Sequence, residues 1–382
     1  MDIEIKLSET MDKNNETDVI RVSKKFIETM GQSVVSVKDK HGLFVNMQLI
    51  PEEGICVDDC GFVSSSTINR FPSIEKYIKV PEPITLGCDP ETLLIEKASG
   101  EVLPMYNFMG KHGDVGNDGT LLEFRPSPSV SPDVVCRNIY SLIKKARNIL
   151  SNQGITEKDT SICGISSYKG NPTGFHLHFG LPKKAIHSRG KSVSLARLIT
   201  NVLDYYVGVP SIIPEGDIDF GRRTAPFVSY GKPGDFRLSS KTLEFRLPGG
   251  INMAHPLLAK GLMSIGAVVI EDIMSRINTY TDNLEDIDDL SKKDSLKMFY
   301  PSLPDMEEYF KIICNRKIEV AISHMPKIIK DIRMMVGYSK MQNEVESYFG
   351  LLFKIKQKAI IHDVEHNWRN YYEQRHQAVV LL

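Results

Sequence analysis

Four short segments of this chain share one pattern, in which a single apolar residue or proline separates two ionisable residues. The four pairs are Asp89 and Glu91, Glu123 and Arg125, His176 and His178, and Glu244 and Arg246. Residues i and i+2 of a β-strand point to the same face of a sheet, so each pair is expected to share one face. The residue between the two charges then points to the opposite face, where a hydrophobic core can form.

The chemistry of these pairs favours a binding face over a solvated one. One such pair alone is most simply explained as solvated charge on a half-exposed strand. Solvent-facing strands usually carry Lys, Thr and Ser, whereas these four combine carboxylate, imidazole and guanidinium groups, which bind divalent cations and phosphate. The alternation also argues against a parallel sheet buried on both faces, and it predicts an antiparallel sheet with one polar face.

Helical patterns lie between these strands, so the chain is expected to have an α+β fold. Ser131-Pro132-Asp133 has the composition of a helix start, and apolar periodicity follows it through Ile149. Residues 192–206 and 256–277 also show helical patterns. Strands and helices therefore alternate along the central part of the chain.

The chain divides into three expected regions. Residues 1–80 form a small mixed, β-rich lobe, in which two strands around Lys40-His41-Gly42 predict a hairpin. Pro81-Glu82-Pro83 breaks the chain, and residues 81–280 carry the charged strands. Residues 281–382 begin with an acidic, polar linker and are expected to be mainly helical.

Composition gives no support for a nucleic-acid-binding, membrane-spanning or disulfide-rich protein. Lys and Arg together number 47 against 48 for Asp and Glu, so overall charge gives no indication of nucleic-acid binding. The chain has no apolar run of about 18 residues, so we expect no membrane span. The spacing of the six cysteines matches no disulfide framework, which favours reduced thiols in a cytoplasmic protein.

Two further groups of residues are candidates for function. Asp118 lies in Asn-Asp-Gly, a strong turn signal, so a purely structural turn and a functional carboxylate both stay open. Residues 221–237 form a glycine- and proline-containing segment with the texture of a loop. Its basic residues are Arg222, Arg223, Lys232 and Arg237. Arginine in an ordered loop is suited to bidentate contact with phosphate, which favours a function for at least two of them.

Several common motifs are absent. The sequence contains no G-x-x-x-x-G-K-[ST], G-x-G-x-x-G or G-x-S-x-G segment, so a bound nucleotide would have to be held by metals and arginines on a sheet. His362 and His366 have the spacing of a zinc-binding helix but lack the H-E-x-x-H order, and we interpret them as packed or solvated helix residues.

Five motifs, in order, resemble a known superfamily. GNPTGFHLHFG resembles the G-N-x-[ST]-G-x-H-x-H motif of glutamine synthetases, and KTLEFRLPG resembles their E-x-R strand. LGCDPETLL and NDGTLLEFRPSP resemble the two acidic strands of the group that includes glutamate–cysteine ligases. With the R-R…Y-G-K-P-G-x-F-R segment, residues 84–275 look similar to phage-encoded carboxylate–amine ligases of the glutamine-synthetase-like superfamily.

The resemblance implies a curved antiparallel sheet that forms an open funnel, packed with helices, and a site for ATP and Mg²⁺. By position, it implies that the metal ligands are Asp89, Glu91, Glu123, His176 and Glu244. His178 would lie near the nucleotide phosphates, and Arg125, Arg222 and Lys232 are expected to bind the nucleotide as well. One histidine among oxygen ligands also leaves Mn²⁺ open.

The resemblance gives the role of Arg246, and the chemistry of phosphoryl transfer suggests the other catalytic residues. Arg246, with Arg223 or Arg237, would neutralise the transferring phosphoryl group. Asp118 is our candidate base for the amine. Asp89 is shorter than the usual Glu of this group, and the additional glutamates of an ammonium site have no counterpart here, which favours an amine larger than ammonia.

The expected function is therefore an ATP- and Mg²⁺-dependent carboxylate–amine ligase that forms an amide through an acyl phosphate. Its substrates would be a small-molecule or peptide carboxylate and an amine, and the relatives are compatible with a homo-oligomer. Two alternatives stay open. The same polar face fits a metal-dependent phosphoesterase or nuclease. The helical C-terminal region also allows a non-catalytic structural or interaction protein on a ligase fold.

Overall fold

The computed structural model divides the chain into two compact units, Met1–Pro83 and Ile84–Leu382, which are described separately. In the first unit it describes only short strands. In the second it describes residues 84–181, 191–224, 231–239, 242–280, 296–297, 299–355 and 362–373. The expected linker that begins at residue 281 lies outside the described residues. The expected limits at residues 80 and 280 stay predictions.

The first unit contains two small sheets. Its strands are β1 (Ile5–Lys6), β2 (Val19–Arg21), β3 (Ser33–Lys38), β4 (Phe44–Leu49) and β5 (Phe62–Ser64). β3 and β4 pair in antiparallel fashion, which confirms the predicted hairpin, and β1 runs parallel to β3. β2 and β5 form a separate antiparallel pair.

In the described part of the second unit, a seven-stranded sheet carries the charged pairs. Its strands are β6 (Thr85–Glu96), β7 (Val115–Asp118), β8 (Leu121–Phe124), β9 (Thr160–Cys163), β12 (Phe175–Gly180), β13 (Phe236–Leu238) and β14 (Thr242–Phe245). The order is β13-β14-β12-β6-β8-β7, and β9 pairs with the C-terminal part of β6. All of these pairings are antiparallel, as the alternation predicted.

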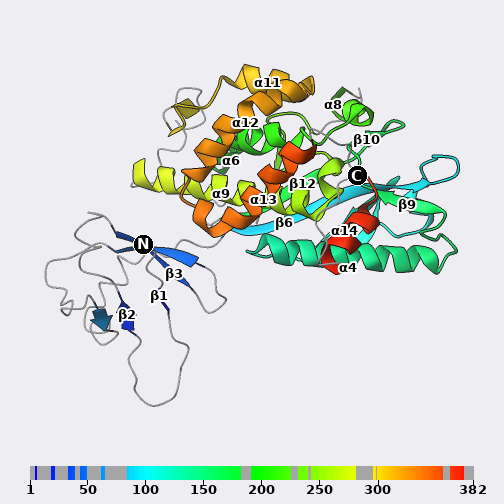
Figure 1. Ribbon diagram of the computed structural model, residues 1–382, viewed down its shortest axis with the longest axis horizontal. Helices are drawn as coiled ribbons and strands as arrows, with labels where there is room; N and C mark the ends of the chain where they lie inside the picture. The colour runs from blue at the N-terminus through cyan, green and yellow to red at the C-terminus, as the bar shows by residue number, and fades with distance from the viewer. Residues whose placement is uncertain are drawn as a thin grey trace, which may run out of the picture. The chain divides into compact units, whose positions relative to one another are not determined.

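One face of this sheet is apolar and buried beneath helices. Phe124, Leu177, Phe179 and Phe245 are at most 1% exposed, and each belongs to the hydrophobic core. Two long helices, α4 (Pro132–Ser151) and α9 (Pro256–Tyr280), pack on the sheet within this core (Figure 1). Phe124, Leu177 and Phe245, each of which lies between two ionisable residues, therefore help to build the core that the alternation predicted.

The expected helices form close to their expected bounds. The side chain of Ser131 accepts a hydrogen bond from the amide of Val134, so the predicted cap of α4 is present. α9 confirms the pattern of residues 256–277. α6 (Lys191–Leu203) forms as predicted, but it continues into a π-helical turn, η2 (Asp204–Gly208). The shorter elements are η1 (Met105–Asn107), β10 (Ser167–Tyr168), β11 (Asn171–Pro172), α7 (Val209–Ser211), η3 (Asp217–Phe220), α8 (Gly221–Thr224) and η4 (Gly250–Met253).

The helical C-terminal region belongs to the same compact unit as the sheet. It contains α11 (Met306–Cys314), α12 (Ile318–Arg333), α13 (Tyr338–Ile355) and α14 (Val364–Glu373). α13 packs along α9 (Figure 1). α14 docks through Trp368, which is fully buried and donates its indole N–H to the Met253 carbonyl at 2.8 Å. These helices therefore complete the core of the sheet-bearing unit.

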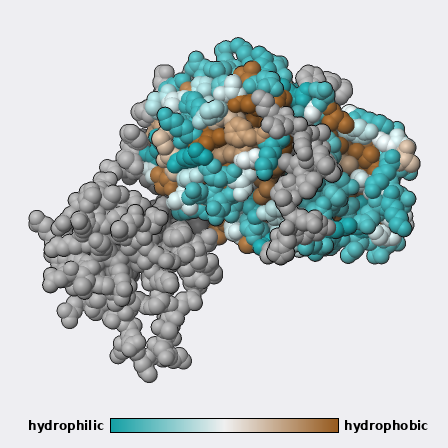
Figure 2. All heavy atoms as spheres, viewed as in Figure 1, coloured by the Kyte–Doolittle hydropathy of each residue, from teal (hydrophilic) through white to brown (hydrophobic). Residues whose placement is uncertain are grey.

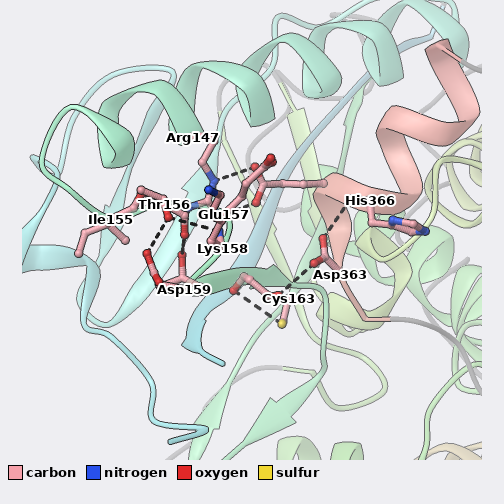
Figure 3. A network of polar contacts seen from close by, with 12 residues as sticks. Arg147, Ile155, Thr156, Glu157, Lys158, Asp159, Cys163, Asp363 and His366 are labelled. Carbon is pink, nitrogen blue, oxygen red and sulfur yellow. Dashed lines mark hydrogen bonds and ion pairs between the residues drawn. The ribbon is translucent and has the colours of Figure 1, made fainter. Parts of the chain in front are cut away.

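A buried ion pair joins α14 to α4. Arg147 donates from Nε to Glu365 Oε1 at 2.8 Å and from Nη1 to Thr160 Oγ1 at 3.0 Å. Figure 3 shows this arginine beside the loop after α4 and the start of α14, where Asp363 accepts a hydrogen bond from Ser161. The charges are thus satisfied by elements far apart in the sequence.

Hydrophilic side chains cover much of the described surface on the face seen in Figure 2, with hydrophobic ones visible between them. Among the residues that the structure describes, none of the helices combines the length and apolar character that a membrane crossing requires.

Candidate functional site

The register of the sheet brings the charged pairs together on the face opposite the core. Asp89 on β6 lies directly across from His176 on β12. His178 lies across from Glu244 on β14, which in turn lies across from Arg237 on β13. Because side chains at facing positions share a face, acidic, imidazole and guanidinium groups from four strands line one continuous surface.

Three of these side chains have the geometry of a metal site. One ligand atom from each of Asp89, His178 and Glu244 can be chosen so that all three lie within 4.8 Å of one another. Asp89 Oδ1 lies 3.1 Å from His178 Nε2 and 3.2 Å from Nδ1 of His176. Two oxygen donors and one nitrogen donor fit Mg²⁺ or Mn²⁺.

The polar atoms of this cluster converge closely. Asp89 Oδ1 is in ion-pair contact with both imidazoles, but Asp89 Oδ1 and His178 Nε2 are buried, and their geometry falls short of a hydrogen bond. Burial would raise the pKa of Asp89, but the two imidazoles hold it well below its usual range. Burial would lower the pKa of His178, yet the Asp89 and Glu244 carboxylates raise it. A bound cation would satisfy these converging atoms.

A second pair of carboxylates lies beside the cluster. Glu91 on β6 faces Glu123 on β8, and Glu91 Oε2 accepts the amide hydrogen of Gly174 at 2.6 Å. Burial raises the pKa of Glu91. Burial, followed by repulsion from nearby carboxylates, also raises the pKa of Glu123 to about 7, although Arg125 pairs with it. Two adjacent carboxylates that lose solvent in this way repel each other, and a shared cation or a shared proton would relieve the repulsion.

Guanidinium groups border the cluster on the β14 side. Arg246 Nε lies 2.9 Å from Glu244 Oε1, and Arg237 Nη1 lies 3.3 Å from Glu244 Oε2. The sequence argument missed Asp235, whose Oδ1 lies 4.0 Å from Arg246 Nη1. The only available signal was its position in Gly-Asp-Phe-Arg, two residues before Arg237.

The other predicted residues lie outside the cluster. Arg222 is fully buried against backbone carbonyls, and Nη1 of buried Arg223 donates to both carboxylate oxygens of Glu215. Lys232 is exposed, and Asp118 is exposed at the end of β7. Their roles toward a ligand stay predictions.

The prediction of a loop over residues 221–237 was wrong at both ends. Residues 221–224 form the helical turn α8, and Phe236 begins β13. β13 pairs with β14 because Phe236 and Leu238 alternate around Arg237.

His362 and His366 have different partners. His362 lies just before α14, with Nδ1 3.3 Å from the Gly164 carbonyl oxygen, whereas exposed His366 contacts Asn370 at 2.9 Å. The packed or solvated interpretation is therefore consistent with their positions.

Comparison with known proteins establishes the family. A family model described as phage phiEco32-like COOH.NH2 ligase-type 2 matches residues 86–370. The chain belongs to this family of carboxylate–amine ligases. The match to the COOH.NH2 ligase family extends into α14, well beyond residues 84–275, to which the motifs pointed. The helical region is therefore part of the family's common architecture.

Solved structures with some similarity are ligases of several kinds. A bifunctional glutathione synthetase from Pasteurella multocida is 10% identical with a TM-score of 0.44, and the match covers 77% of this chain and 52% of that one. Glutamine synthetase of Plasmodium falciparum is 10% identical with a TM-score of 0.38, and the match covers 95% of this chain and 91% of that one.

A complex of the prokaryotic ubiquitin-like protein Pup with its ligase PafA is 11% identical with a TM-score of 0.32, covering 74% of each chain. The chain spans about half the length of the glutathione synthetase. No curated protein matches the chain. At these scores, the similarities support no inference about its substrates.

Proposed function

We propose that this chain is an ATP- and Mg²⁺-dependent ligase that joins a carboxylate to an amine through an acyl phosphate. The observation that carries the proposal is the convergence of Asp89, His178 and Glu244 within 4.8 Å, with Arg246 at 2.9 Å from Glu244. Metal ligands next to a guanidinium are the combination that phosphoryl transfer requires. Membership in a carboxylate–amine ligase family supports this proposal over a phosphoesterase.

The proposed reaction balances in two steps. In the first, a carboxylate oxygen of the substrate bonds to the γ-phosphorus of ATP, the bond to the β–γ bridging oxygen breaks, and ADP leaves. In the second, the amine nitrogen bonds to the acyl carbon, inorganic phosphate leaves, and the nitrogen loses a proton. The products are the amide, ADP and phosphate, so ATP drives a condensation that is unfavourable in water.

The residues of the polar face have distinct proposed roles. Asp89, His178 and Glu244 would hold one divalent ion, and Glu91 with Glu123 would hold a second. Such ions supply charge neutralisation for the phosphates. The protein itself orients the nucleotide and keeps water from the reacting atoms.

The charged groups at the two edges complete the proposed site. Arg246 and Arg237 would offset the charge that builds on the γ-phosphoryl oxygens. At the other edge, Asp118 lies on the same face as Glu123, diagonally across β7 and β8, and we propose that it accepts the proton from the amine.

The experiment is a mass-spectrometric screen of carboxylates and amines with Mg·ATP, with ADP release measured in parallel. We expect a product that has lost water and ADP formation that depends on the carboxylate. Glu244→Gln should lower ADP formation by about 10²–10³-fold. Glu307→Gln is the control, because the Glu307 side chain is 86% exposed on α11.

Two outcomes would replace the proposal. Cleavage of a phosphodiester with metal alone, without any nucleotide requirement, would favour the phosphoesterase. If purified protein shows no binding of Mg·ATP by calorimetry, the ligase proposal fails and a structural role gains support.

A further inference from the structure

The guanidinium of Arg222 lies in the protein interior rather than on the polar face. The residue is fully buried, and Nη2 donates hydrogen bonds to three consecutive carbonyl oxygens. The acceptors are Arg246 at 2.9 Å, Leu247 at 3.4 Å and Pro248 at 3.1 Å. One side chain thus holds the backbone that immediately follows β14.

This backbone carries two parts of the candidate site. It bears Arg246 itself, whose amide donates to the Asp235 carbonyl at 3.3 Å. It also joins β12, because the Pro248 carbonyl accepts the amide hydrogen of Phe175 at 2.9 Å, one residue before His176. A shift of these carbonyls would therefore move Arg246 and the start of the histidine strand together.

Gly231 also packs against the guanidinium of Arg222. Gly231 has a φ of +87°, and a Cβ built on it would lie 2.8 Å from Arg222 Cζ. Its backbone therefore lies directly against the guanidinium. The Gly231 amide also donates to Asp235 Oδ2 at 3.1 Å, and Asp235 faces Arg246. Arg222 is enclosed between the loop that presents Asp235 and the segment that presents Arg246.

We propose that Arg222 is a positioning residue, which fixes Arg246 against Glu244 through the carbonyls after β14 and does not contact the nucleotide. The inference rests on the proposed ligase function. All three carbonyl contacts come from Nη2, at the far end of the guanidinium. The lysine side chain is shorter than that of arginine, so Arg222→Lys keeps the charge but places its donor short of these carbonyls, and Arg246 should no longer be held in place. A misplacement of about 1 Å at a reacting centre can cost about 10²-fold in rate.

The first test compares Arg222→Lys with the wild type in two measurements. We expect the maximal rate of ADP formation from Mg·ATP to fall by about 10²-fold. The dissociation constant for Mg·ADP, measured by calorimetry, should stay within about threefold, since Arg222 does not touch the nucleotide. In the double variant Arg222→Lys/Arg246→Lys, the rate should be no lower than in Arg246→Lys alone. Both changes act through the same group, the guanidinium of Arg246.

A second test uses two glycines of one loop as a matched pair. Gly231 and Gly234 have φ values of +87° and +81°, so alanine meets the same backbone strain at both. Only at Gly231 would the new Cβ meet Arg222, because nothing lies within 4 Å of it at Gly234. Gly231→Ala should reproduce the rate loss of Arg222→Lys, whereas Gly234→Ala should retain most of the wild-type rate. Thermal unfolding of each variant shows whether it is folded.

The outcomes distinguish a failure of the positioning role from a failure of the proposed ligase function. A dissociation constant for Mg·ADP that weakens tenfold or more in Arg222→Lys would show that Arg222 binds the nucleotide. Equal rate losses in the two glycine variants, or an unchanged rate in Arg222→Lys, would also overturn the positioning role. Failure of the wild-type protein to bind Mg·ADP or to turn over ATP would instead reject the ligase function on which the inference rests.

Discussion

Asp89 Oδ1 lies 3.1 Å from His178 Nε2, although the two residues do not face each other in the sheet. Asp89 faces His176, and His178 faces Gly87. Because Gly87 has no side chain, the imidazole of His178 has room to lean diagonally across β6 toward the carboxylate. The diagonal contact brings His178 into the group of possible metal ligands, a position that the motif resemblance assigned to His176.

This contact predicts which histidine matters more for metal binding. His178→Ala should weaken Mn²⁺ binding by about tenfold or more, which corresponds to about 1.4 kcal/mol. His176→Ala should weaken it less: His176 Nδ1 lies 3.2 Å from Asp89 and 3.8 Å from Glu244, but the ligand atoms within 4.8 Å of one another are those of Asp89, His178 and Glu244. Calorimetry with Mn²⁺ measures both, and exposed His366 on α14 provides the control, His366→Ala. A larger loss in His176→Ala would restore the assignment from the motif.

The buried pair of Arg147 and Glu365 predicts an asymmetric stability effect. Arg147→Met leaves the Glu365 carboxylate buried without its partner, so the free energy of unfolding should fall by about 3–5 kcal/mol. Replacing both residues with methionine should recover much of that loss, because no isolated charge remains. Urea unfolding gives the values.

The exposed pair of Arg369 and Glu157 is the comparison, with side chains 47% and 53% exposed. Glu157→Gln should change the free energy of unfolding by less than about 1 kcal/mol. If the two single variants at Arg147 and Glu157 lose the same amount, burial is not the cause.

His255 predicts a loss of stability in weak acid. Burial lowers the pKa of His255 to about 4, while the unfolded chain has a value of about 6.5. The folded state therefore binds fewer protons, and stability is lost as the pH falls from about 6.5 to about 4. The difference corresponds to about 3 kcal/mol.

A matched variant isolates this effect from other titrating groups. His255 Nδ1 accepts the amide hydrogen of Leu257 at the start of α9, and asparagine can supply an acceptor there without titrating. Between pH 7 and pH 4, the wild type should lose about 3 kcal/mol more than His255→Asn in urea unfolding. Parallel pH profiles for the two proteins would contradict the prediction.

Two helical glycines predict opposite responses to alanine. A Cβ at Gly266 on α9 would lie 2.4 Å from Phe179 Cζ on β12, so Gly266→Ala should destabilise the fold by about 1–3 kcal/mol. Gly350 on α13 has nothing within 4 Å of such a Cβ. Gly350→Ala should stabilise by about 0.5–1 kcal/mol, because alanine favours a helix. Thermal and urea unfolding compare them, and the same sign for both would refute the packing argument.

The sequence by itself determined the strands and their two faces. Alternation in β6, β8, β12 and β14 is a local property, because successive side chains of a strand point to opposite faces wherever the strand lies. The start of α4 at Ser131 was likewise readable, since a cap acts within one turn of its helix.

Only the tertiary structure decided which of these residues meet. Strand order brings Glu244 beside His178 and both beside Asp89, and no local pattern specifies which strands become neighbours. Nor does the sequence separate a surface arginine from Arg222, whose burial depends on carbonyls about 25 residues further along the chain. The physical reason is that side-chain direction is set by local backbone geometry, whereas burial and partnership arise only when distant segments pack together.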